Sequence, residues 1–351
     1  MNSTSSREIG FGICGLGMVA DFHAQALALV PGAKLVAVAS RQREKTRAFA
    51  EKHHVGIAVA TMEELVTQPG VDAVCITTSS GAHLEPALVA IRAGKHVMIE
   101  KPVEITTERA DQILHAAAAA GVQVGAIFQG RFGDGARTVK AAVAAGRLGR
   151  MVLASASVKW HRTAPYYSGT RGSFAADGGG ALMAQGIHAV DLLQWFAGMP
   201  AEVFGWSTRR VHTGIEAEDT LVASLKFQDG AVGSIEASTA LWPGWRRRLE
   251  LCGEKGSIAL EDDHIARWEF REPVPGDADI QAAQDGAVLG SGASVPSAIS
   301  VVGHQRQLQD FVAALRAGRA PSLDGREGRK AVALVRAIYD SAASGAPMRI
   351  V

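Results

Sequence analysis

Short apolar runs alternate with helical patterns over the first 130 residues. The apolar runs predict buried strands at residues 9–15, 34–40, 71–78, 95–100 and 122–128. The segments between them predict helices at residues 16–29, 43–53, 61–66, 83–94 and 108–121. Thr61 and Glu64 have the spacing of a capping box, and Gly121 closes the last of these helices. Strands that alternate with helices of this length indicate an α/β fold with a parallel, doubly wound sheet.

The pattern changes after Arg131. A short helix at residues 138–145 is followed by segments that alternate or run apolar, and these predict strands at residues 151–160, 202–211, 219–227, 231–241, 247–253 and 256–261. Turn pairs between them, Asp229-Gly230 and Gly253-Glu254, indicate hairpins and a large, mostly antiparallel open sheet. Such a sheet needs cover on both faces, so we expect helices on one face and another subunit on the other.

The end of the chain completes this outline. Residues 273–300 are rich in glycine, serine and alanine and predict a mobile surface loop. Two helices are predicted at residues 304–317 and 326–344, and the second is a candidate to pack back on the N-terminal domain. We therefore expect a parallel-sheet domain at residues 1–128 and a second α/β domain at residues 129–351.

Composition narrows the classes of protein. The 351 residues are 47% hydrophobic and 20% charged, and the net charge of +1 gives no basic field for nucleic acid. The three cysteines are far apart, and no cysteine–histidine cluster predicts a metal site. Since no signal peptide or membrane-spanning stretch is evident, we expect a cytoplasmic protein with no membrane partner.

The first strand ends in a glycine turn, Gly15-Leu16-Gly17-Met18-Val19-Ala20, which fits G-x-G-x-x-(G/A). Because the turn follows a strand and opens a helix, it predicts a dinucleotide site that includes Gly15, Gly17, Met18 and Val19. At the end of the second strand, Ser40-Arg41 stands where a carboxylate would accept the ribose hydroxyls of NAD. A 2′-phosphate could be held there instead, so NADP is favoured over NAD without excluding it.

Glu100-Lys101-Pro102 follows the strand at residues 95–100. Ligands of open α/β sheets bind beyond the carboxyl ends of the strands, so Lys101 is expected to point toward the substrate. Its ammonium group can hydrogen-bond a substrate oxygen and stabilise negative charge during hydride transfer.

Three stretches together resemble the Gfo/Idh/MocA family, which includes glucose–fructose oxidoreductase and inositol dehydrogenase: GLGMVADFHAQAL, AGKHVMIEKP and GGGALMAQGIHAVDLLQW. The resemblance implies an N-terminal Rossmann domain, a C-terminal domain with a large open sheet, and homodimers or homotetramers built on that sheet. It also implies nicotinamide-dependent oxidation or reduction at a hydroxyl-bearing carbon, commonly of a sugar or cyclitol.

The resemblance also assigns residues. Lys101 and His188 correspond to the family's active-site lysine and histidine. Asp191, one turn after His188, could orient the imidazole, contact substrate, or anchor the helix. The residues that the resemblance places on the cofactor side are Thr78, Ser80, His83, Glu100 and Gln129, the last being part of a Q-x-R-F element with Arg131.

Ala184 occupies a position where many family members carry aspartate or asparagine, four residues before the histidine. Alanine can neither hydrogen-bond through its side chain nor transfer a proton. Three interpretations stay open: other groups hold the substrate, catalysis has been lost, or the residue has been substituted.

The loop before this helix combines aromatic and guanidinium side chains that suit a sugar ring, namely Trp160, Arg162, Tyr166, Tyr167 and Arg171. The alternative is that these aromatic residues belong to the core or to an interface. Asp177 could cap the following helix, and Trp242 to Trp245 could form another pocket wall. His161, His212 and His304 are expected to be structural or solvated.

The sequence therefore predicts an NAD- or NADP-dependent oxidoreductase for a sugar or polyol-like small molecule, with Lys101 and His188 as catalytic residues. One alternative is a reductase of the dihydrodiol dehydrogenase or biliverdin reductase type. Another is a non-catalytic, nucleotide-sensing binding protein on the same fold.

Overall fold

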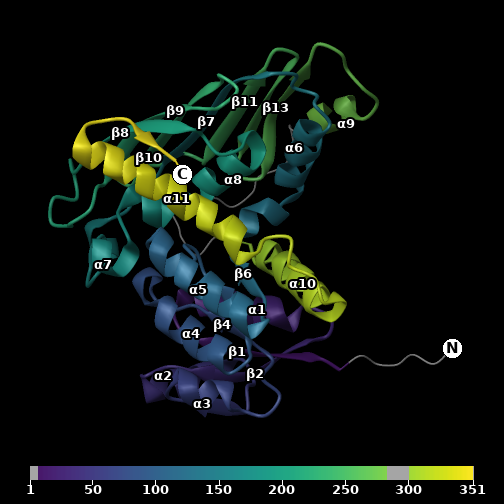
Figure 1. Cartoon of the computed structure of the whole chain (residues 1–351), viewed down its shortest axis with the longest axis vertical. Helices are drawn as coiled ribbons and strands as arrows, with labels where there is room; N and C mark the ends of the chain where they lie inside the picture. The colour runs from purple at the N-terminus through teal and green to yellow at the C-terminus, as the bar shows by residue number, and fades with distance from the viewer. Residues whose placement is uncertain (1–6, 283–299, 351) are drawn as a thin grey trace. The chain divides into compact units, whose positions relative to one another are not determined.

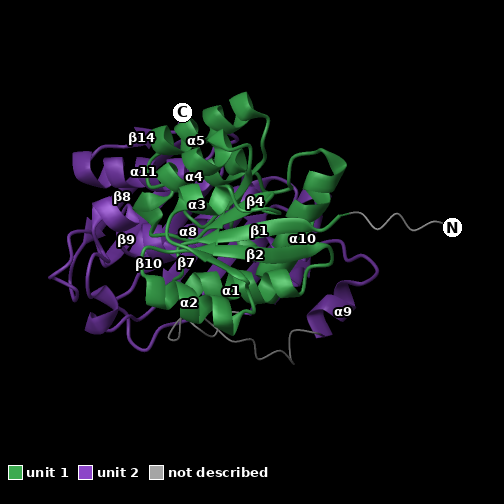
Figure 2. Cartoon of the chain, turned by 90° about the horizontal axis from the view of Figure 1, so that it is seen from below, with its two compact units in different colours: residues 1–129, 301–329 green, residues 130–300, 330–351 purple. Residues whose placement is uncertain are grey.

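The computed structural model describes residues 7–282 and 300–350. The chain forms two compact units, coloured separately in Figure 2, and each is built around one β-sheet. The first unit comprises residues 1–129 and 301–329, and the second comprises residues 130–300 and 330–351. Each unit therefore draws on two separate stretches of the sequence.

Six parallel strands form the sheet of the first unit, in the order β3-β2-β1-β4-β5-β6. They are β1 (Ile9–Cys14), β2 (Ala33–Ala39), β3 (Ile57–Val59), β4 (Ala73–Ile76), β5 (His96–Ile99) and β6 (Val124–Ala126). The helices between them are α1 (Met18–Ala28), α2 (Arg43–Lys52), α3 (Met62–Val66), α4 (Leu84–Arg92) and α5 (Thr107–Ala120), with a 3-10 turn η1 (Ser80–Ala82) (Figure 1). This order is that of a Rossmann sheet and confirms the predicted doubly wound fold.

Two helix ends agree with the capping residues predicted from the sequence. The capping box at Thr61 and Glu64 is present at the start of α3. Gly121 ends α5 in the left-handed conformation, with φ of 67°. Strand β3 was not predicted, because three residues are too few to produce a recognisable apolar run.

The core of the first unit includes a segment from far along the chain. Helix α10 (Val302–Ala317) packs against α1, and its buried Phe311 contributes to the cluster around Phe11, with the two ring centroids 6.4 Å apart. Helix α11 (Gly325–Ser344) begins in this unit and continues from Lys330 in the second. Both helices begin within two residues of their predicted starts.

Eight strands form the sheet of the second unit, in the order β13-β12-β11-β7-β10-β9-β8-β14. They are β7 (Met151–Lys159), β8 (Glu202–Thr208), β9 (Thr220–Lys226), β10 (Val232–Ser238), β11 (Arg248–Gly253), β12 (Gly256–Glu261), β13 (His264–Phe270) and β14 (Met348–Arg349). Only β7 and β10 pair in parallel, so the sheet is mostly antiparallel as predicted. Strands β13 and β14 were not predicted.

Short helices and turns connect these strands: η2 (Gln129–Phe132), α6 (Asp134–Ala144), η3 (Ala164–Tyr167), α7 (Phe174–Asp177), η4 (Leu182–Gly186), α8 (Ile187–Ala197) and α9 (Asp277–Ala282). Helix α6 begins four residues before its predicted start. Within the predicted surface loop, residues 277–282 form α9, which the ion pair of Asp277 with Arg147 at 2.7 Å holds, while residues 283–299 lie outside the described part.

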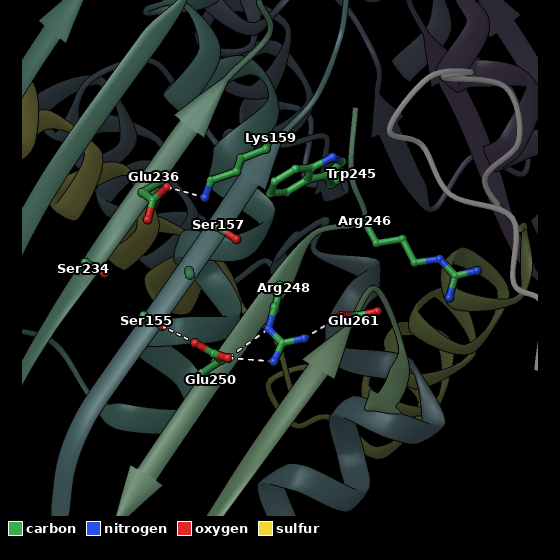
Figure 3. Close-up of a pocket in the computed structure, with 11 residues that line it drawn as sticks. Ser155, Ser157, Lys159, Ser234, Glu236, Trp245, Arg246, Arg248, Glu250 and Glu261 are labelled. Carbon is green, nitrogen blue, oxygen red and sulfur yellow. Dashed lines mark hydrogen bonds and ion pairs between the residues drawn. The ribbon is translucent and has the colours of Figure 1, made fainter. Parts of the chain in front are cut away.

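The two faces of the second sheet differ in polarity. Along β7, Ala154, Ala156 and Val158 are buried on the face that α8 covers. Because side chains alternate along a strand, Ser155 and Ser157 lie on the opposite face. A depression of about 550 Å³ lies on that face, shown in Figure 3.

Ion pairs line this depression, within strand β11 and between neighbouring strands. Lys159 pairs with Glu236 at 2.6 Å, and Arg248 pairs with Glu250 at 2.7 Å and with Glu261 at 2.6 Å (Figure 3). The charges in the depression therefore largely satisfy one another. In the described ranges, no helix has both the length and the apolar character needed to cross a membrane.

Candidate active site

The glycine turn lies at the end of β1, where the strand order of the first sheet reverses. Gly15 has a φ of +94°, and a Cβ atom there would lie 2.7 Å from the backbone nitrogen of Thr78. The backbone conformation and the packing against Thr78 therefore both favour glycine at this position.

Gly17 has a different environment. It is the extended N-cap of α1, and among the described residues no side chain caps this helix. A Cβ atom on Gly17 would meet nothing within 4 Å. The uncapped N–H groups and the positive end of the helix dipole thus border open space, which fits the pyrophosphate of a dinucleotide.

Ser40 and Arg41 directly follow β2 at the same edge of the sheet. The N–H of Gly15 donates to the carbonyl of Ala39 at 3.0 Å, which places the end of β2 beside the glycine turn. Arg41 is exposed, and the hydroxyl of half-buried Ser40 accepts from the N–H of Gln42 at 3.3 Å. This edge therefore offers a guanidinium and a hydroxyl group instead of a carboxylate.

His83 joins two loops of the first unit. Its Nδ1 lies 2.9 Å from the carbonyl oxygen of Pro102, and its Nε2 lies 3.2 Å from that of Thr78. The ring is buried, and burial lowers the pKa of His83 against the bonds to the two carbonyls. Ser80 begins η1 within the loop that His83 supports.

Glu100 is a buried carboxylate between two imidazoles. Its Oε1 lies 2.9 Å from Nε2 of His23 and 3.8 Å from Nε2 of His304, and its Oε2 accepts from the backbone N–H of Lys101 at 3.0 Å. Burial by itself would raise the pKa of Glu100, but the hydrogen bonds from the two histidines outweigh it and hold that pKa well below its usual range. The cluster fixes the backbone from which half-buried Lys101 extends.

Gln129 has a side-chain oxygen that could accept a hydrogen bond from a ligand. Its side-chain oxygen is buried and has no hydrogen-bond partner within the part of the chain that the structure describes. A buried amide oxygen is costly to leave without a partner. This atom fits a ligand that brings an N–H group, such as the carboxamide of a nicotinamide.

In the second unit, His188 lies near the start of α8, just after the π turn η4. The sequence predicted a regular amphipathic helix here. The π turn is the difference, and such turns occur frequently at functional sites. Its residues Leu182, Met183 and Gly186 are buried, whereas Ala184, Gln185 and His188 are half-buried and form the accessible stripe.

Glu218 and Tyr339 satisfy the first four N–H groups of this helix. The carboxylate of Glu218 accepts from Gly180 at 3.1 Å and Leu182 at 2.8 Å, and its backbone carbonyl accepts from Ala181 at 3.0 Å. The hydroxyl of Tyr339 accepts from Gly180 and from Met183, each at 3.2 Å, and donates to Glu218 at 2.9 Å. Burial raises the pKa values of Glu218 and Tyr339, although the hydrogen bonds from the backbone N–H groups act to lower them.

These contacts explain the glycines that precede the helix. A Cβ atom on Gly180 would lie 1.8 Å from the carbonyl oxygen of Glu218, and one on Gly179 would lie 2.2 Å from the hydroxyl of Tyr339. Glycine is therefore needed for the two capping residues to approach the backbone.

Asp191 forms a buried ion pair. Its two carboxylate oxygens accept from Nε and Nη2 of Arg131, at 2.8 and 2.7 Å. The two side chains are 1% and 5% exposed, and the guanidinium lies over the ring of Trp195. This geometry favours the anchoring role for Asp191 over direct contact with a substrate.

The aromatic and arginine side chains of residues 160–171 form a stacked group. The guanidinium of Arg162 lies 4.9 Å from the ring centroid of Trp160 and 5.5 Å from that of Tyr166, and Arg171 lies 4.5 Å from Tyr166. Trp160 is buried, whereas Tyr166 and Tyr167 are half-buried with their rings edge to face at 5.0 Å.

Gln185 connects this group to the helix of His188. Its side chain accepts from Arg162 at 3.2 Å and donates to the hydroxyl of Tyr166 at 2.6 Å. We define Trp160, Arg162, Tyr166, Tyr167, Arg171 and Gln185 as the aromatic–arginine wall.

The remaining sequence candidates have other surroundings. Asp177 accepts from the N–H of Gly172, five residues earlier. His212 is buried against the ring of Tyr167, and His161 lies edge-on to Trp242. Trp242 and Trp245 are 80% and 64% exposed, and Trp245 lines the depression on the eight-stranded sheet (Figure 3).

Sequence reasoning missed four residues: His23, Gln185, Glu218 and Tyr339. His23 carried one local signal, because it is a polar residue on the buried face of α1. Gln185 stands directly beside the alanine at 184. Glu218 and Tyr339 are 121 positions apart and had no signal of any kind.

The chain resembles proteins of known activity over most of its length. A family model described as an oxidoreductase family with an NAD-binding Rossmann fold matches residues 9–128, and the GFO/IDH/MocA C-terminal domain model matches residues 136–259. The 1,5-anhydro-D-fructose reductase of Ensifer adhaerens is 28% identical, covering 95% of this chain and 96% of the relative. The myo-inositol 2-dehydrogenase of Thermotoga maritima is also 28% identical, covering 72% and 75%.

A solved structure of a similar protein also supports membership of this family. The WlbA dehydrogenase of Bordetella pertussis, in complex with NADH and UDP-GlcNAcA, is 31% identical with a TM-score of 0.90 and covers 99% of each chain. The predicted family is therefore confirmed: the chain belongs to the GFO/IDH/MocA family of NAD-binding oxidoreductases.

Proposed function

We propose that this oxidoreductase transfers hydride between a nicotinamide dinucleotide and a hydroxyl-bearing carbon of a sugar or cyclitol. One observation supports this most directly: Gln185, on the helix that carries His188, is hydrogen bonded to Arg162 and Tyr166. Aromatic faces beside hydrogen-bonding edges suit the mixed C–H and hydroxyl surface of a sugar ring.

Several residues of the first unit would hold the cofactor. The open space beside Gly17 and the N–H groups of Met18 and Val19 suit the pyrophosphate. The buried oxygen of Gln129 suits the carboxamide, and the loop with Thr78 and Ser80 is assigned to the nicotinamide side. When bound, the nicotinamide accepts or delivers the hydride.

Lys101 and His188 would act on the reacting oxygen. In the oxidative direction the substrate carbon gives up hydride while its hydroxyl loses a proton. We assign that proton to the imidazole of His188, and we assign to the ammonium of Lys101 the stabilisation of the oxygen as it loses the proton. Glu100 and Asp191 are positioning residues, since both are buried in ion pairs or hydrogen bonds with the protein itself.

We favour NADP over NAD. Ser40 and Arg41 offer a hydroxyl and a guanidinium where NAD-specific sites carry a carboxylate. A guanidinium can hold a 2′-phosphate with two parallel hydrogen bonds. Fluorescence titration should therefore give a lower dissociation constant for NADPH than for NADH, and Arg41→Ala should reduce that difference.

The absence of a polar side chain at Ala184 is compatible with turnover, because positioning and one proton acceptor are the main needs of hydride transfer. The test is to follow dinucleotide absorbance with myo-inositol, 1,5-anhydro-D-fructose and UDP-GlcNAcA, using the parent and Ala184→Asp. Turnover by the parent that Lys101→Met abolishes supports the proposal. Turnover only after Ala184→Asp would identify a dinucleotide-binding protein that has lost catalysis, and failure to bind either dinucleotide would refute the enzyme function.

We also propose self-association through the open face of the eight-stranded sheet. Besides the depression with its ion pairs, several apolar side chains are exposed on the strands of this sheet, including Trp206 at 61%, Val222 at 43% and Val232 at 51%. Light scattering should report a homodimer or homotetramer, and Val222→Glu should dissociate it.

All three cysteines are free thiols, which accords with the cytoplasmic location we expect.

A further inference from the structure

Both polar atoms of the Gln185 amide form hydrogen bonds within the wall. A guanidinium can only donate hydrogen bonds, so the atom of Gln185 that faces Arg162 at 3.2 Å must be the oxygen Oε1. The nitrogen Nε2 then faces Tyr166, and it donates to the phenol oxygen at 2.6 Å. Arg162 therefore sets the orientation of the amide, and the amide sets the role of the phenol.

Tyr166 is left with a proton to donate. Its oxygen is occupied as an acceptor, and a neutral phenol keeps one O–H donor. Among the residues that the structure describes, no atom accepts that proton, and the side chain of Tyr166 is half-buried. The O–H group is therefore available to a bound molecule.

The surrounding charge selects the acceptor. Two guanidinium groups, of Arg162 and Arg171, lie 5.5 and 4.5 Å from the ring centroid of Tyr166. Arginine stays charged in proteins, so the acceptor nearest this ring is favoured if it carries negative charge. Carboxylate and phosphate oxygens meet this requirement, whereas a neutral hydroxyl gains less.

We propose that Gln185 is a positioning residue that makes Tyr166 the hydrogen-bond donor to a negatively charged oxygen of the substrate, and the carboxylate of UDP-GlcNAcA, the ligand bound by the similar WlbA dehydrogenase, serves as the probe. This inference rests on the proposed function and deepens it, because it makes the substrate an acidic sugar derivative. It would also supply, from the neighbouring wall, a polar contact that alanine at 184 cannot make.

The test compares two probes that differ in one group. UDP-GlcNAcA carries the carboxylate, and the matched nucleotide sugar carries a neutral hydroxymethyl group in its place. Binding of each is measured by calorimetry with NADH present, for the parent, Tyr166→Phe, Gln185→Glu and the double variant. Gln185→Glu keeps the size of the side chain but turns Nε2 into an acceptor, which would capture the proton of Tyr166.

We expect each single variant to weaken binding of UDP-GlcNAcA at least about tenfold, with NADH bound as before and the hydroxymethyl nucleotide sugar weakened less. The double variant should be no weaker than Tyr166→Phe alone, because both changes remove the same hydrogen bond. Gln185→Met, which is similar in size and lacks both polar atoms, controls for packing and should fall between the parent and Gln185→Glu.

A spectroscopic measurement tests the orientation without any substrate. The relative intensity of the tyrosine ring bands in the Raman spectrum depends on whether the phenol oxygen accepts or donates. Subtracting the Tyr166→Phe spectrum isolates Tyr166 among only three tyrosines. The parent should show an accepting oxygen, and Gln185→Glu a donating hydroxyl.

The outcomes separate the two proposals. A Tyr166 oxygen that does not accept a hydrogen bond in the unliganded parent, or unchanged UDP-GlcNAcA binding in both single variants, would overturn the role of Gln185. If Lys101→Met still abolished turnover in that case, the proposed function would stand. Failure of every sugar to turn over would refute the proposed function, while the Raman comparison would still decide the orientation.

Discussion

The hydroxyl of Tyr339 donates to the carboxylate of Glu218 at 2.9 Å, and together these residues satisfy the backbone N–H groups of residues 180–183. A helix normally leaves its first four N–H groups without an intrahelical partner. Here two residues from elsewhere in the second unit complete the start of the helix that carries His188.

Removal of this hydroxyl should destabilise the protein and slow turnover. Tyr339→Phe leaves the buried N–H of Met183 without an acceptor, while Gly180 keeps its bond to Glu218, so we expect the free energy of unfolding to fall by about 1–3 kcal/mol. Because the helix shifts, kcat should fall while the dissociation constant for the dinucleotide is unchanged. Asp340→Asn, at the exposed neighbouring position of α11, is the control. Loss of stability with unchanged kcat would show that the cap does not position His188.

The two glycines of the turn should respond differently to alanine. Gly17→Ala should change the free energy of unfolding by less than about 1 kcal/mol, because its Cβ would meet no protein atom within 4 Å. It should still weaken dinucleotide binding at least about tenfold, since the methyl group occupies the space assigned to the pyrophosphate.

Gly15→Ala should instead destabilise the fold, because of its positive φ and its 2.7 Å approach to Thr78. Gly56→Ala, which also meets open space, should change neither property. Equal dinucleotide affinity of Gly17→Ala and the parent would contradict the assigned site.

The pair of Arg131 and Asp191 should be structural. Asp191→Asn removes the negative charge beside a buried guanidinium and should lower the free energy of unfolding by about 3–5 kcal/mol. Replacing both residues, as Arg131→Met with Asp191→Leu, should recover part of that loss. Below the unfolding temperature, the KM of Asp191→Asn for substrate should match that of the parent. A large rise in KM without loss of stability would restore Asp191 as a substrate ligand.

Stability should decrease on mild acidification. Burial lowers the pKa of His23 from 6.5, and the contact with Glu100 only partly opposes this shift. The unfolded chain then takes up a proton that the folded protein excludes, so stability is present above pH 6.5 and is lost as the pH falls.

The expected slope is at most about 1.4 kcal/mol per pH unit for this residue. Denaturant unfolding from about pH 7.5 to about pH 5.5 should show a shallower dependence for His23→Gln than for the parent. The exposed His54 provides the control, and His54→Gln should retain the parental slope. Parallel slopes for all three proteins would contradict a neutral, buried His23.

The sequence was sufficient where the determining interactions are local. Alternation of apolar runs, the turn at Gly15 and the cap at Thr61 act over a few residues, so the first sheet and its helix ends were predicted well. In the same way, alternation and the hairpin turns predicted most strands of the second sheet. Strand β14 has only two residues and pairs with β8 at the edge, so no local pattern could indicate it.

The site was harder to predict because its support comes from distant segments. His188 and the aromatic–arginine wall were recognisable from a resemblance and from side-chain chemistry. Their connection through Gln185 was not, because it depends on how the loop folds back over the helix. Glu100 was expected on the cofactor side, yet its carboxylate is engaged by His23, 77 positions earlier in the chain.

The division of each unit between two stretches of sequence has a consequence for biosynthesis. When residues 1–129 have left the ribosome, their sheet still lacks Phe311 and the rest of α10, which complete its core. The second sheet likewise waits for Tyr339 and β14. Neither half can therefore reach its final packing during most of translation, and a nascent chain that stops before about residue 300 should be a substrate for chaperones and proteases rather than a folded intermediate.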